Sequence, residues 1–241
     1  MRYIVVSDLH GNEHYFLRVL QVLESRGWTL DEGGYLFHPQ ETLIVAGDVI
    51  DRGRKSAEIA HYLWTHDNGC VVSLMGNHDI KLHHYFYSGR TFNHPDWKAT
   101  EASLEKNPHL INDLARAVYK LPYRFTGEKF QVAHAYYSKS NELCIYGPTD
   151  NSERIPWWQA ETPNKLTIFG HYHHSRQQWT NPEKDSVCVD TWDDGGVFTY
   201  AVVTEDAFAD TTVEIHENVG WPIEQDITDY KLILNFIGRY Y

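Results

Sequence analysis

An α/β fold is predicted for this chain of 241 residues by three features of its sequence. Short apolar, β-branched runs recur in the first third of the chain. Each run is followed by a polar loop and then by a stretch with helical spacing. The second half has turn-like clusters between apolar runs instead. Alternation of strand, loop and helix is typical of βαβ units on a parallel sheet, and the turn clusters predict added antiparallel pairing.

The first third contains three predicted main strands and two predicted helices. The strands are continuous apolar runs, and the helices repeat apolar residues every three or four positions. Gly27 ends the first helix, and a turn at Gly33-Gly34 precedes a short strand at 35–38. The main strands are expected at 2–6, 42–46 and 69–74, and the helices at 12–26 and 56–67.

Residues 80–120 are predicted to be mostly helical, with breaks near Gly89, Pro95 and Pro108. Two hairpins are expected after this segment, around the turn-like stretches 126–128 and 193–196. Their strands, and two single strands, are expected at 123–125, 129–133, 165–169, 186–190, 197–204 and 213–216.

The domain organisation is expected to be simple. We find no internal repeat, low-complexity tract or linker, which predicts one domain over residues 1–241. The helical segment at about 80–120 is expected near the functional site, and an aromatic tail ends the chain.

Composition narrows the function classes. The chain has 33 acidic and 21 basic residues and a net charge of −12, which argues against extended nucleic-acid binding. No run approaches the ~18 to 20 apolar residues of a membrane helix, and the N-terminus lacks a secretory signal. Three widely spaced cysteines argue against a disulfide framework and favour a cytoplasmic location.

Polar side chains follow five of the predicted strands. In open α/β sheets, ligands bind beyond the carboxyl ends of the strands. Carboxylates and imidazoles without a cysteine favour Mn²⁺, Fe or Zn²⁺ over a structural thiolate site. The motifs, in chain order, are Asp8-Leu9-His10, Gly47-Asp48-Val49-Ile50-Asp51-Arg52-Gly53, Gly76-Asn77-His78-Asp79, His134 and Gly170-His171-Tyr172-His173.

The order of these motifs resembles that of the calcineurin-like metallophosphoesterases. Asp51-Arg52-Gly53 resembles the phosphoprotein-phosphatase branch, which includes bacterial serine/threonine phosphatases and symmetric diadenosine tetraphosphatases. Residues 144–149, Cys-Ile-Tyr-Gly-Pro-Thr, and Val189-Asp190-Thr191 resemble the phosphatase module of bacterial polynucleotide kinase-phosphatases. The resemblance covers about residues 1–204.

The resemblance implies a two-sheet β-sandwich flanked by helices, with two metal ions at one edge. Manganese is the expected metal, and iron, zinc, nickel or cobalt are alternatives. By motif, Asp48 binds both ions, and the second histidine of Gly-His-x-His joins the first ion. The implied ligands are Asp8, His10, Asp48 and His173 for the first ion and Asp48, Asn77, His134 and His171 for the second.

The resemblance also implies catalytic and substrate-binding residues. His78 becomes the general acid, oriented by Asp79 or another carboxylate. Asp51 is expected to orient a metal-binding histidine or to bond the backbone. Arg52 is expected to clamp the substrate phosphate. Arg154 is the candidate for a second phosphate-binding arginine, and Asn77 also faces the substrate.

The predicted function is metal-dependent hydrolysis of a phosphomonoester or phosphoanhydride by in-line attack of a metal-bridging hydroxide. The substrate is expected to be a phosphorylated small molecule, a nucleotide or a phosphoprotein. Symmetric dinucleoside polyphosphate hydrolysis, serine/threonine protein dephosphorylation and phosphodiester hydrolysis stay open, the last because of His173. A catalytically inactive metal-binding scaffold is a further alternative, although His10, His78 and Arg52 argue against it.

Overall fold

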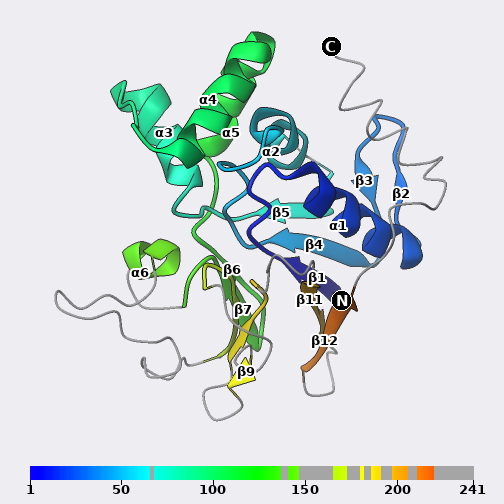
Figure 1. The fold of residues 1–241 in the computed structure, drawn as a ribbon. Coiled ribbons are helices and arrows are strands. Elements are labelled where there is room, and N and C mark those ends of the chain that lie inside the picture. Colours follow the sequence, from blue (N-terminus) through cyan, green and yellow to red (C-terminus); the bar gives the residue numbers. More distant parts are fainter. Residues whose placement is uncertain are drawn as a thin grey trace.

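The computed structural model describes residues 1–65, 68–136, 141–146, 165–172, 180–181, 186–190, 197–205 and 211–219. Within these ranges, two five-stranded sheets and a two-stranded sheet are flanked by helices (Figure 1). The two-stranded sheet pairs β2 (Thr29–Leu30) with β3 (Leu36–Phe37). The mixed α/β architecture expected from the sequence is confirmed.

The first large sheet has the strand order β12-β11-β1-β4-β5. Strands β1, β4 and β5, which come from the first third of the chain, run parallel, as the βαβ pattern predicts. The later strands β11 and β12 are antiparallel to their neighbours. The bounds are β1 Arg2–Val6, β4 Glu41–Val45, β5 Val71–Ser73, β11 Val197–Thr204 and β12 Thr212–Val219.

The second large sheet has the order β6-β7-β8-β10-β9. Strands β7, β8 and β10 are parallel, while β6 and β9 pair antiparallel at the two edges. The predicted hairpin around residues 126–128 is confirmed as the β6–β7 pair. The bounds are β6 Arg124–Thr126, β7 Phe130–Ala133, β8 Leu166–Phe169, β9 Thr180–Asn181 and β10 Ser186–Cys188.

The second predicted hairpin is wrong. Strand β10 pairs in parallel with β8 in the second sheet, whereas β11 pairs with β1 in the first. The chain therefore crosses between sheets where a tight turn was expected. The eight-residue β11 has its own antiparallel partner in the eight-residue β12, so β10 is not needed to cover its other edge.

A capping side chain or a proline marks the start of three of the described helical segments, α1, α4 and η1. Asn12 caps α1, accepting hydrogen bonds from two backbone N–H groups of its first turn. Pro95 and Pro108 start helical segments rather than interrupting one, since proline fits the first helical position. The helical segments are α1 Glu13–Ser25, α2 Ser56–Trp64, α3 Asp79–Ser88, α4 Pro95–Lys106, η1 Pro108–Leu110, α5 Ile111–Val118 and α6 Asn141–Tyr146.

Side-chain alternation along the strands builds the core on both faces of the first sheet. In β1, Ile4 and Val6 lie in the apolar cluster shared with α1, α2, α4 and α5. Val5 points the other way and lies with Ile44 in a cluster that includes Val132 and other residues of the second sheet. The two sheets therefore pack face to face, with helices covering the outer face of the first.

Strand register brings the candidate residues to one edge. Val6 of β1 is paired with Val45 of β4, and Val45 with Ser73 of β5, so the three parallel strands end at the same level. The loops that carry Asp8, Asp48 and Asn77 leave the sheet there. The described helices include none long and apolar enough to cross a membrane.

Candidate active site

Left-handed backbone is concentrated at the strand ends. Among the described residues, six that are not glycine have positive φ, with values between 48° and 73°. This conformation costs an L-residue about 1 kcal/mol or more, and such strain is found where function requires it. All six lie in the predicted motifs: Asp8, His10, Asp48, Asp51, Arg52 and His171.

Neighbouring glycines let these loops approach each other. A Cβ on Gly170 would lie 1.8 Å from Ser7 Oγ, and one on Gly53 would lie 2.1 Å from the carbonyl oxygen of Gly11. A Cβ on Gly76 would lie 2.3 Å from Asp48 N. Only glycine fits these positions, so the sequence dictates the close approach of the loops.

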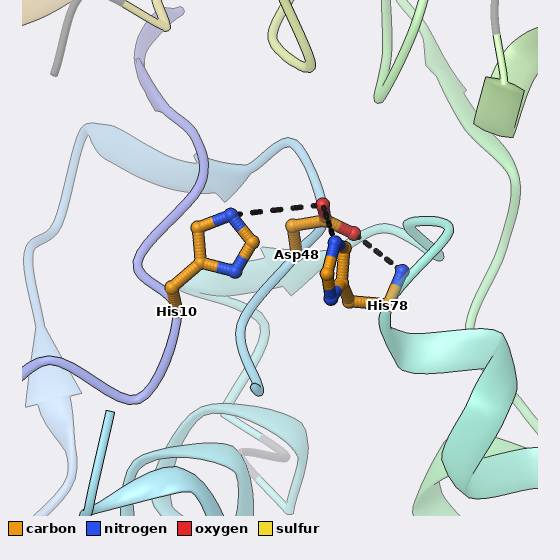
Figure 2. Close-up of side chains that lie close together, drawn as sticks. All are labelled: His10, Asp48 and His78. Atoms are coloured by element: carbon orange, nitrogen blue, oxygen red, sulfur yellow. Dashed lines mark hydrogen bonds and ion pairs between the residues drawn. The ribbon is translucent and has the colours of Figure 1, made fainter. Parts of the chain in front are cut away.

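Asp48 lies at the centre of the site. Its Oδ2 is 3.8 Å from His10 Nε2 and 3.8 Å from His78 Nε2 (Figure 2). Its Oδ1 accepts a hydrogen bond of 2.8 Å from the backbone N–H of His78. The same Oδ2 is 3.3 Å from His134 Nε2. One buried carboxylate oxygen therefore faces three imidazoles.

A second group of ligand atoms adjoins the first and spans the two sheets. Asn77 Oδ1 lies 2.9 Å from His134 Nε2 and 2.9 Å from His171 Nδ1, and the two ring nitrogens are 3.2 Å apart. Asn77 follows β5 of the first sheet, whereas His134 and His171 follow β7 and β8 of the second. The His134 Nδ1 atom lies 2.9 Å from the carbonyl oxygen of Ala46 across the interface.

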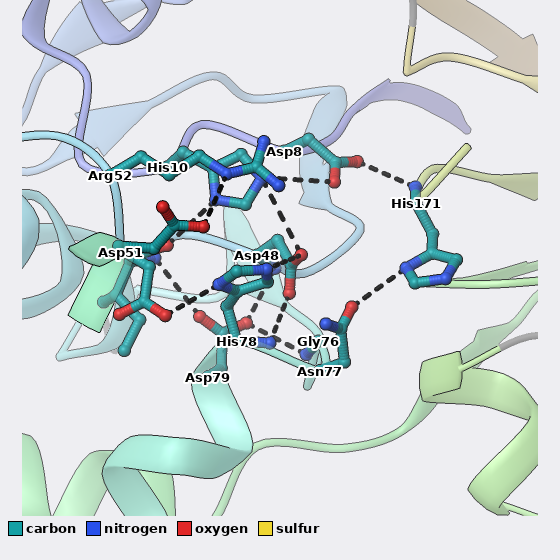
Figure 3. A network of polar contacts seen from close by, with 12 residues as sticks. Asp8, His10, Asp48, Asp51, Arg52, Gly76, Asn77, His78, Asp79 and His171 are labelled. Carbon is teal, nitrogen blue, oxygen red and sulfur yellow. Dashed lines mark hydrogen bonds and ion pairs between the residues drawn. The ribbon is translucent and has the colours of Figure 1, made fainter. Parts of the chain in front are cut away.

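Asp8 links the two groups. Its Oδ1 is 3.8 Å from His10 Nε2, and its Oδ2 accepts a hydrogen bond of 3.0 Å from the backbone N–H of His171 (Figure 3). The Ser7 hydroxyl also donates to this oxygen. His10 Nδ1 lies 3.0 Å from the carbonyl oxygen of Ile50, so its Nε2 is the nitrogen that faces the carboxylates.

The protonation equilibria reflect a cluster of buried charges. Burial raises the pKa of Asp48, but His134, His78 and His10 outweigh burial and hold that pKa well below its ordinary value. Burial lowers the pKa of His134, but Asp48 and Asp8 raise it to about 10. Among these imidazoles, His134 is thus the one whose charged form the two carboxylates favour.

His78 forms a dyad with Asp51 rather than with Asp79. His78 Nδ1 lies 2.7 Å from Asp51 Oδ2, and Asp51 Oδ1 accepts a hydrogen bond of 2.7 Å from the Thr100 hydroxyl of α4. Lys81 Nζ donates to the same Asp51 Oδ2 at 2.7 Å. Burial opposes ionisation of Asp51, but its bonds with His78, Lys81 and Thr100 bring its pKa below the ordinary value.

Asp79 organises the backbone of the loop instead of orienting His78. It accepts hydrogen bonds from the N–H groups of Asp48, Val49, Ile50 and Gly76, at 2.8 to 3.3 Å. Burial and the Asp48 carboxylate raise the pKa of Asp79, while the backbone donors oppose that rise. Of the two expected possibilities, Asp79 or another carboxylate, the second holds, because Asp51 is the carboxylate that reaches Nδ1 and Asp79 holds the loop.

Arg52 lies beside the ligand cluster, and its side chain is 43% exposed (Figure 3). Its Nε donates to Asp96 Oδ2 at 3.4 Å, and its backbone N–H donates to the Asp96 carbonyl at 3.0 Å. Burial is the main cause that lowers the pKa of His10 to about 4; Asp48 and Asp8 oppose the shift, and the Arg52 charge adds to it. The guanidinium is thus near the cluster and still open to solvent.

A further buried carboxyl stands behind Asp8. Asp190 follows β10 and is completely buried. Burial, followed by the Asp8 charge, raises the pKa of Asp190 well above its ordinary value. The sequence singled out Val189-Asp190-Thr191 by resemblance without giving Asp190 a role.

The donor set fits metal ions. Atoms bound to one ion at about 2.0 to 2.2 Å lie roughly 3 Å apart, as do the ring nitrogens of His134 and His171 and the amide oxygen of Asn77. Among the residues that the structure describes, two groups of side chains converge closely enough to hold an ion and share Asp48: His10, Asp48 and His78, and Asp48, His134 and His171. His78 therefore lies at ligand distance as well as in the dyad.

Most, but not all, of the residues described in this site were candidates from the sequence. His173 and Arg154 lie outside the described residues. Lys81 and Thr100 were missed. Lys81 stands three residues after His78 at the start of a helix, a spacing that faces it toward His78. Thr100 carries no local signal, since only the packing of α4 brings it to Asp51.

Comparison with known proteins defines the class. The family model described as calcineurin-like phosphoesterase matches residues 1–199. A bis(5'-nucleosyl)-tetraphosphatase PrpE [asymmetrical] of Bacillus subtilis is 31% identical over 196 residues, which cover 71% of this chain and 79% of the relative. The corresponding Bacillus velezensis protein is 26% identical over 206 residues, covering 75% of this chain and 81% of the relative.

Solved structures agree on the fold. A metallophosphoesterase of Sphaerobacter thermophilus has a TM-score of 0.52 at 18% identity, covering 99% of this chain and 95% of that one. A cold-active protein-tyrosine phosphatase of a Shewanella species has a TM-score of 0.56 at 15% identity, with 83% and 74% covered.

Fold, clustered ligands and relatives together define a metal-dependent phosphohydrolase. The chain belongs to the calcineurin-like phosphoesterase family. Members of that family bind a pair of divalent metal ions.

Proposed function

We propose that this protein hydrolyses a phosphoanhydride bond of a dinucleoside polyphosphate, cleaving it asymmetrically. The observation that carries the proposal is the sharing of one Asp48 oxygen between two ligand groups beside the His78–Asp51 dyad. The two Bacillus relatives are named as asymmetrical bis(5'-nucleosyl)-tetraphosphatases, which supports the substrate class. From the sequence, only the symmetric form of this reaction was expected as an alternative.

The proposed metal ligands form two sets. Asp8, His10 and Asp48, which the structure brings together, would hold one ion, with His173, which lies outside the described residues, as the proposed fourth ligand. Bound divalent ions would activate a water and neutralise phosphate charge. We infer manganese for both positions, because carboxylate, amide and imidazole ligands without thiolate suit it. The second ion would be held by Asp48, Asn77, His134 and His171, whose ligand atoms converge.

His78 serves as the general acid. Asp51 engages its Nδ1, so its Nε2 faces the site and can pass a proton to the leaving oxygen as the P–O bond breaks. His78→Ala is expected to lower kcat ~10²- to 10⁴-fold while metal content stays unchanged. Because His78 Nε2 also lies at ligand distance, loss of metal from this variant would make it a ligand instead.

Arg52 binds the substrate phosphates beside the ligand cluster. Its planar fork suits two phosphate oxygens, and Asp96 holds its backbone and Nε while solvent still reaches the guanidinium. Arg154, which lies outside the described residues, stays our candidate for a second arginine. Asn77, whose Oδ1 lies 2.9 Å from His134 and His171, is our candidate for contact with both an ion and the substrate.

The reaction is tested with diadenosine tetraphosphate and Mn²⁺, with the products separated by chromatography. Asymmetric cleavage releases ATP and AMP, whereas symmetric cleavage releases two ADP. Parallel arms use p-nitrophenyl phosphate, bis-p-nitrophenyl phosphate and a phosphopeptide. The expected result is ATP and AMP at a kcat/KM above that of every parallel substrate. Two ADP, or faster turnover of the phosphopeptide, would contradict the proposal.

We also infer a cytoplasmic location. The three cysteines, Cys70, Cys144 and Cys188, are free and buried, which suits a reducing compartment. Fractionation of the native cells tests this, and recovery of the protein outside the cytoplasmic fraction would contradict it.

A further inference from the structure

Lys81 occupies an unusual place for a lysine. It lies in the first turn of α3, where the helix dipole disfavours a positive charge and acidic residues are preferred. Its side chain is only 21% exposed, although lysine is among the residues most often found in solvent. Such a position needs a partner that offsets both costs.

The partner is the catalytic dyad. Lys81 Nζ lies 2.7 Å from Asp51 Oδ2, and His78 Nδ1 lies 2.7 Å from the same oxygen. Nζ and Nδ1 are themselves 3.0 Å apart. Lys81 Nζ, His78 Nδ1 and the buried Asp51 Oδ2 therefore lie within 3.0 Å of one another, although they come from two segments of the chain.

The chemistry of the three groups defines what this arrangement does. An ammonium group has only donors, so Lys81 fixes Asp51 Oδ2 by a charge-assisted hydrogen bond. Asp51 Oδ1 is fixed separately by Thr100. With both oxygens held, the carboxylate cannot rotate away from Nδ1, and Nε2 is the ring nitrogen left to face Asp48.

We propose that Lys81 is a positioning residue that acts through Asp51 to hold the His78 imidazole for proton transfer. This inference rests on the proposed function, because it assigns Lys81 to the general acid of that reaction. A surface ion pair of this kind contributes little, but here the shared carboxylate is completely buried, so loss of the lysine leaves it partly uncompensated.

The test compares Lys81→Met with the matched control Lys98→Met, a lysine exposed on α4. Each variant is assayed with phenyl phosphate, a poor leaving group, and p-nitrophenyl phosphate, a good one. We expect Lys81→Met to lower kcat for phenyl phosphate ~10- to 100-fold, part of the span of general acid catalysis. The loss for p-nitrophenyl phosphate should stay below about threefold, with KM and metal content unchanged.

Two further variants separate positioning from folding. Lys81→Arg keeps the charge and the donors, and it should retain most of the activity. Lys81→Met should add no further loss in a His78→Ala background, because both changes disable the same proton transfer. Lys98→Met should leave both substrates unaffected.

The inference is overturned by an equal loss on both substrates, by no loss, by an Arg variant as impaired as the Met variant, or by full additivity with His78→Ala. Failure of the proposed function looks different. In that case the unmodified protein itself fails to release ATP and AMP from diadenosine tetraphosphate. The leaving-group comparison on aryl phosphates still reports on Lys81.

Discussion

The two ends of β4 bury carboxylates in contrasting surroundings. At its start, Glu41 is paired with arginines: Arg26 Nη2 lies 2.7 Å from Oε1, Arg26 Nε donates to Oε2 at 3.1 Å, and Arg2 Nε is 3.3 Å from Oε1. The Trp28 indole N–H donates at 3.0 Å. Just beyond its other end, Asp48 faces imidazoles, whose charge depends on pH.

The contrast separates stability from function within one strand and its following loop. Guanidinium groups stay charged at all relevant pH values, so Glu41 is compensated permanently. A metal ion binds imidazole in its neutral form and displaces any extra proton into solution, so the partners that offset the charge of Asp48 are exchangeable. A buried carboxylate with exchangeable partners marks a cation site, and one with fixed partners marks a structural ion pair.

The largest effect is expected at the functional end. Asp48→Asn should lower the occupancy of both metal positions, because a neutral amide cannot offset two dications. Activity should fall at least ~10³-fold. Elemental analysis of the purified variant, with turnover measured beside it, checks this. If the variant retained two ions and full activity, Asp48 would not be the ligand that the two metal positions share.

The structural end should respond in the opposite way. Glu41→Gln leaves Arg26 without its carboxylate and should lower the free energy of unfolding by roughly 2 kcal/mol. Metal content and kcat should be unchanged, since Glu41 lies at the far end of the strand. Urea denaturation of the metal-free protein measures the first quantity. An activity loss without a stability loss would contradict the structural role of Glu41.

The pH dependence of this difference sharpens the comparison. Burial raises the pKa of Glu41, but Arg26 and Trp28 bring it below the ordinary value of 4.5. A lowered folded-state pKa contributes stability that is fully present above the unfolded pKa and is lost as pH falls through the folded one. The stability gap between the native protein and Glu41→Gln should thus be constant from pH 6 to 8 and shrink below about pH 4.5. A gap that widens in acid would show the opposite sign.

The smallest expected effect concerns backbone strain in the functional loop. Arg52 has a φ of 63°, so Arg52→Gly should be more stable than Arg52→Ala by about 1 kcal/mol. Both variants lose the same guanidinium and should lose activity alike. Thermal unfolding of the pair isolates the backbone term. Equal stability, or a more stable alanine variant, would mean that the loop is not strained there.

How much of the site was predictable depended on the range of the interaction. Asp8, His10, Asp48, Asn77, His134 and His171 could be grouped from the sequence because each follows a recognisable strand, and strand ends meet at one edge of a sheet. The choice of Asp51 over Asp79 as partner of His78 could not. Asp79 is next to His78 in sequence whereas Asp51 lies 27 residues earlier, and only the folded structure decides that Asp51 reaches Nδ1.

The fold showed the same limit. The main strands of the first third, β1, β4 and β5, were predicted within about two residues, since apolar runs are local signals, whereas the two-residue β2 was not predicted. The assignment of β10 and β11 to different sheets was missed. The stretch 193–196 has the residues of a tight turn, but strand pairing depends on which edges the rest of the molecule leaves open.

The second ligand group lies on the seam between the two sheets, since Asn77 and Asp48 come from one sheet and His134 and His171 from the other. An ion bound there would cross-link the halves of the sandwich without a covalent bond. By mass action it would raise the free energy of unfolding by about 2.7 kcal/mol at a free metal concentration of one hundred times Kd, and Tm would rise with it. The metal would then stabilise the packing of the two sheets as well as support catalysis, so its removal would lower both stability and activity.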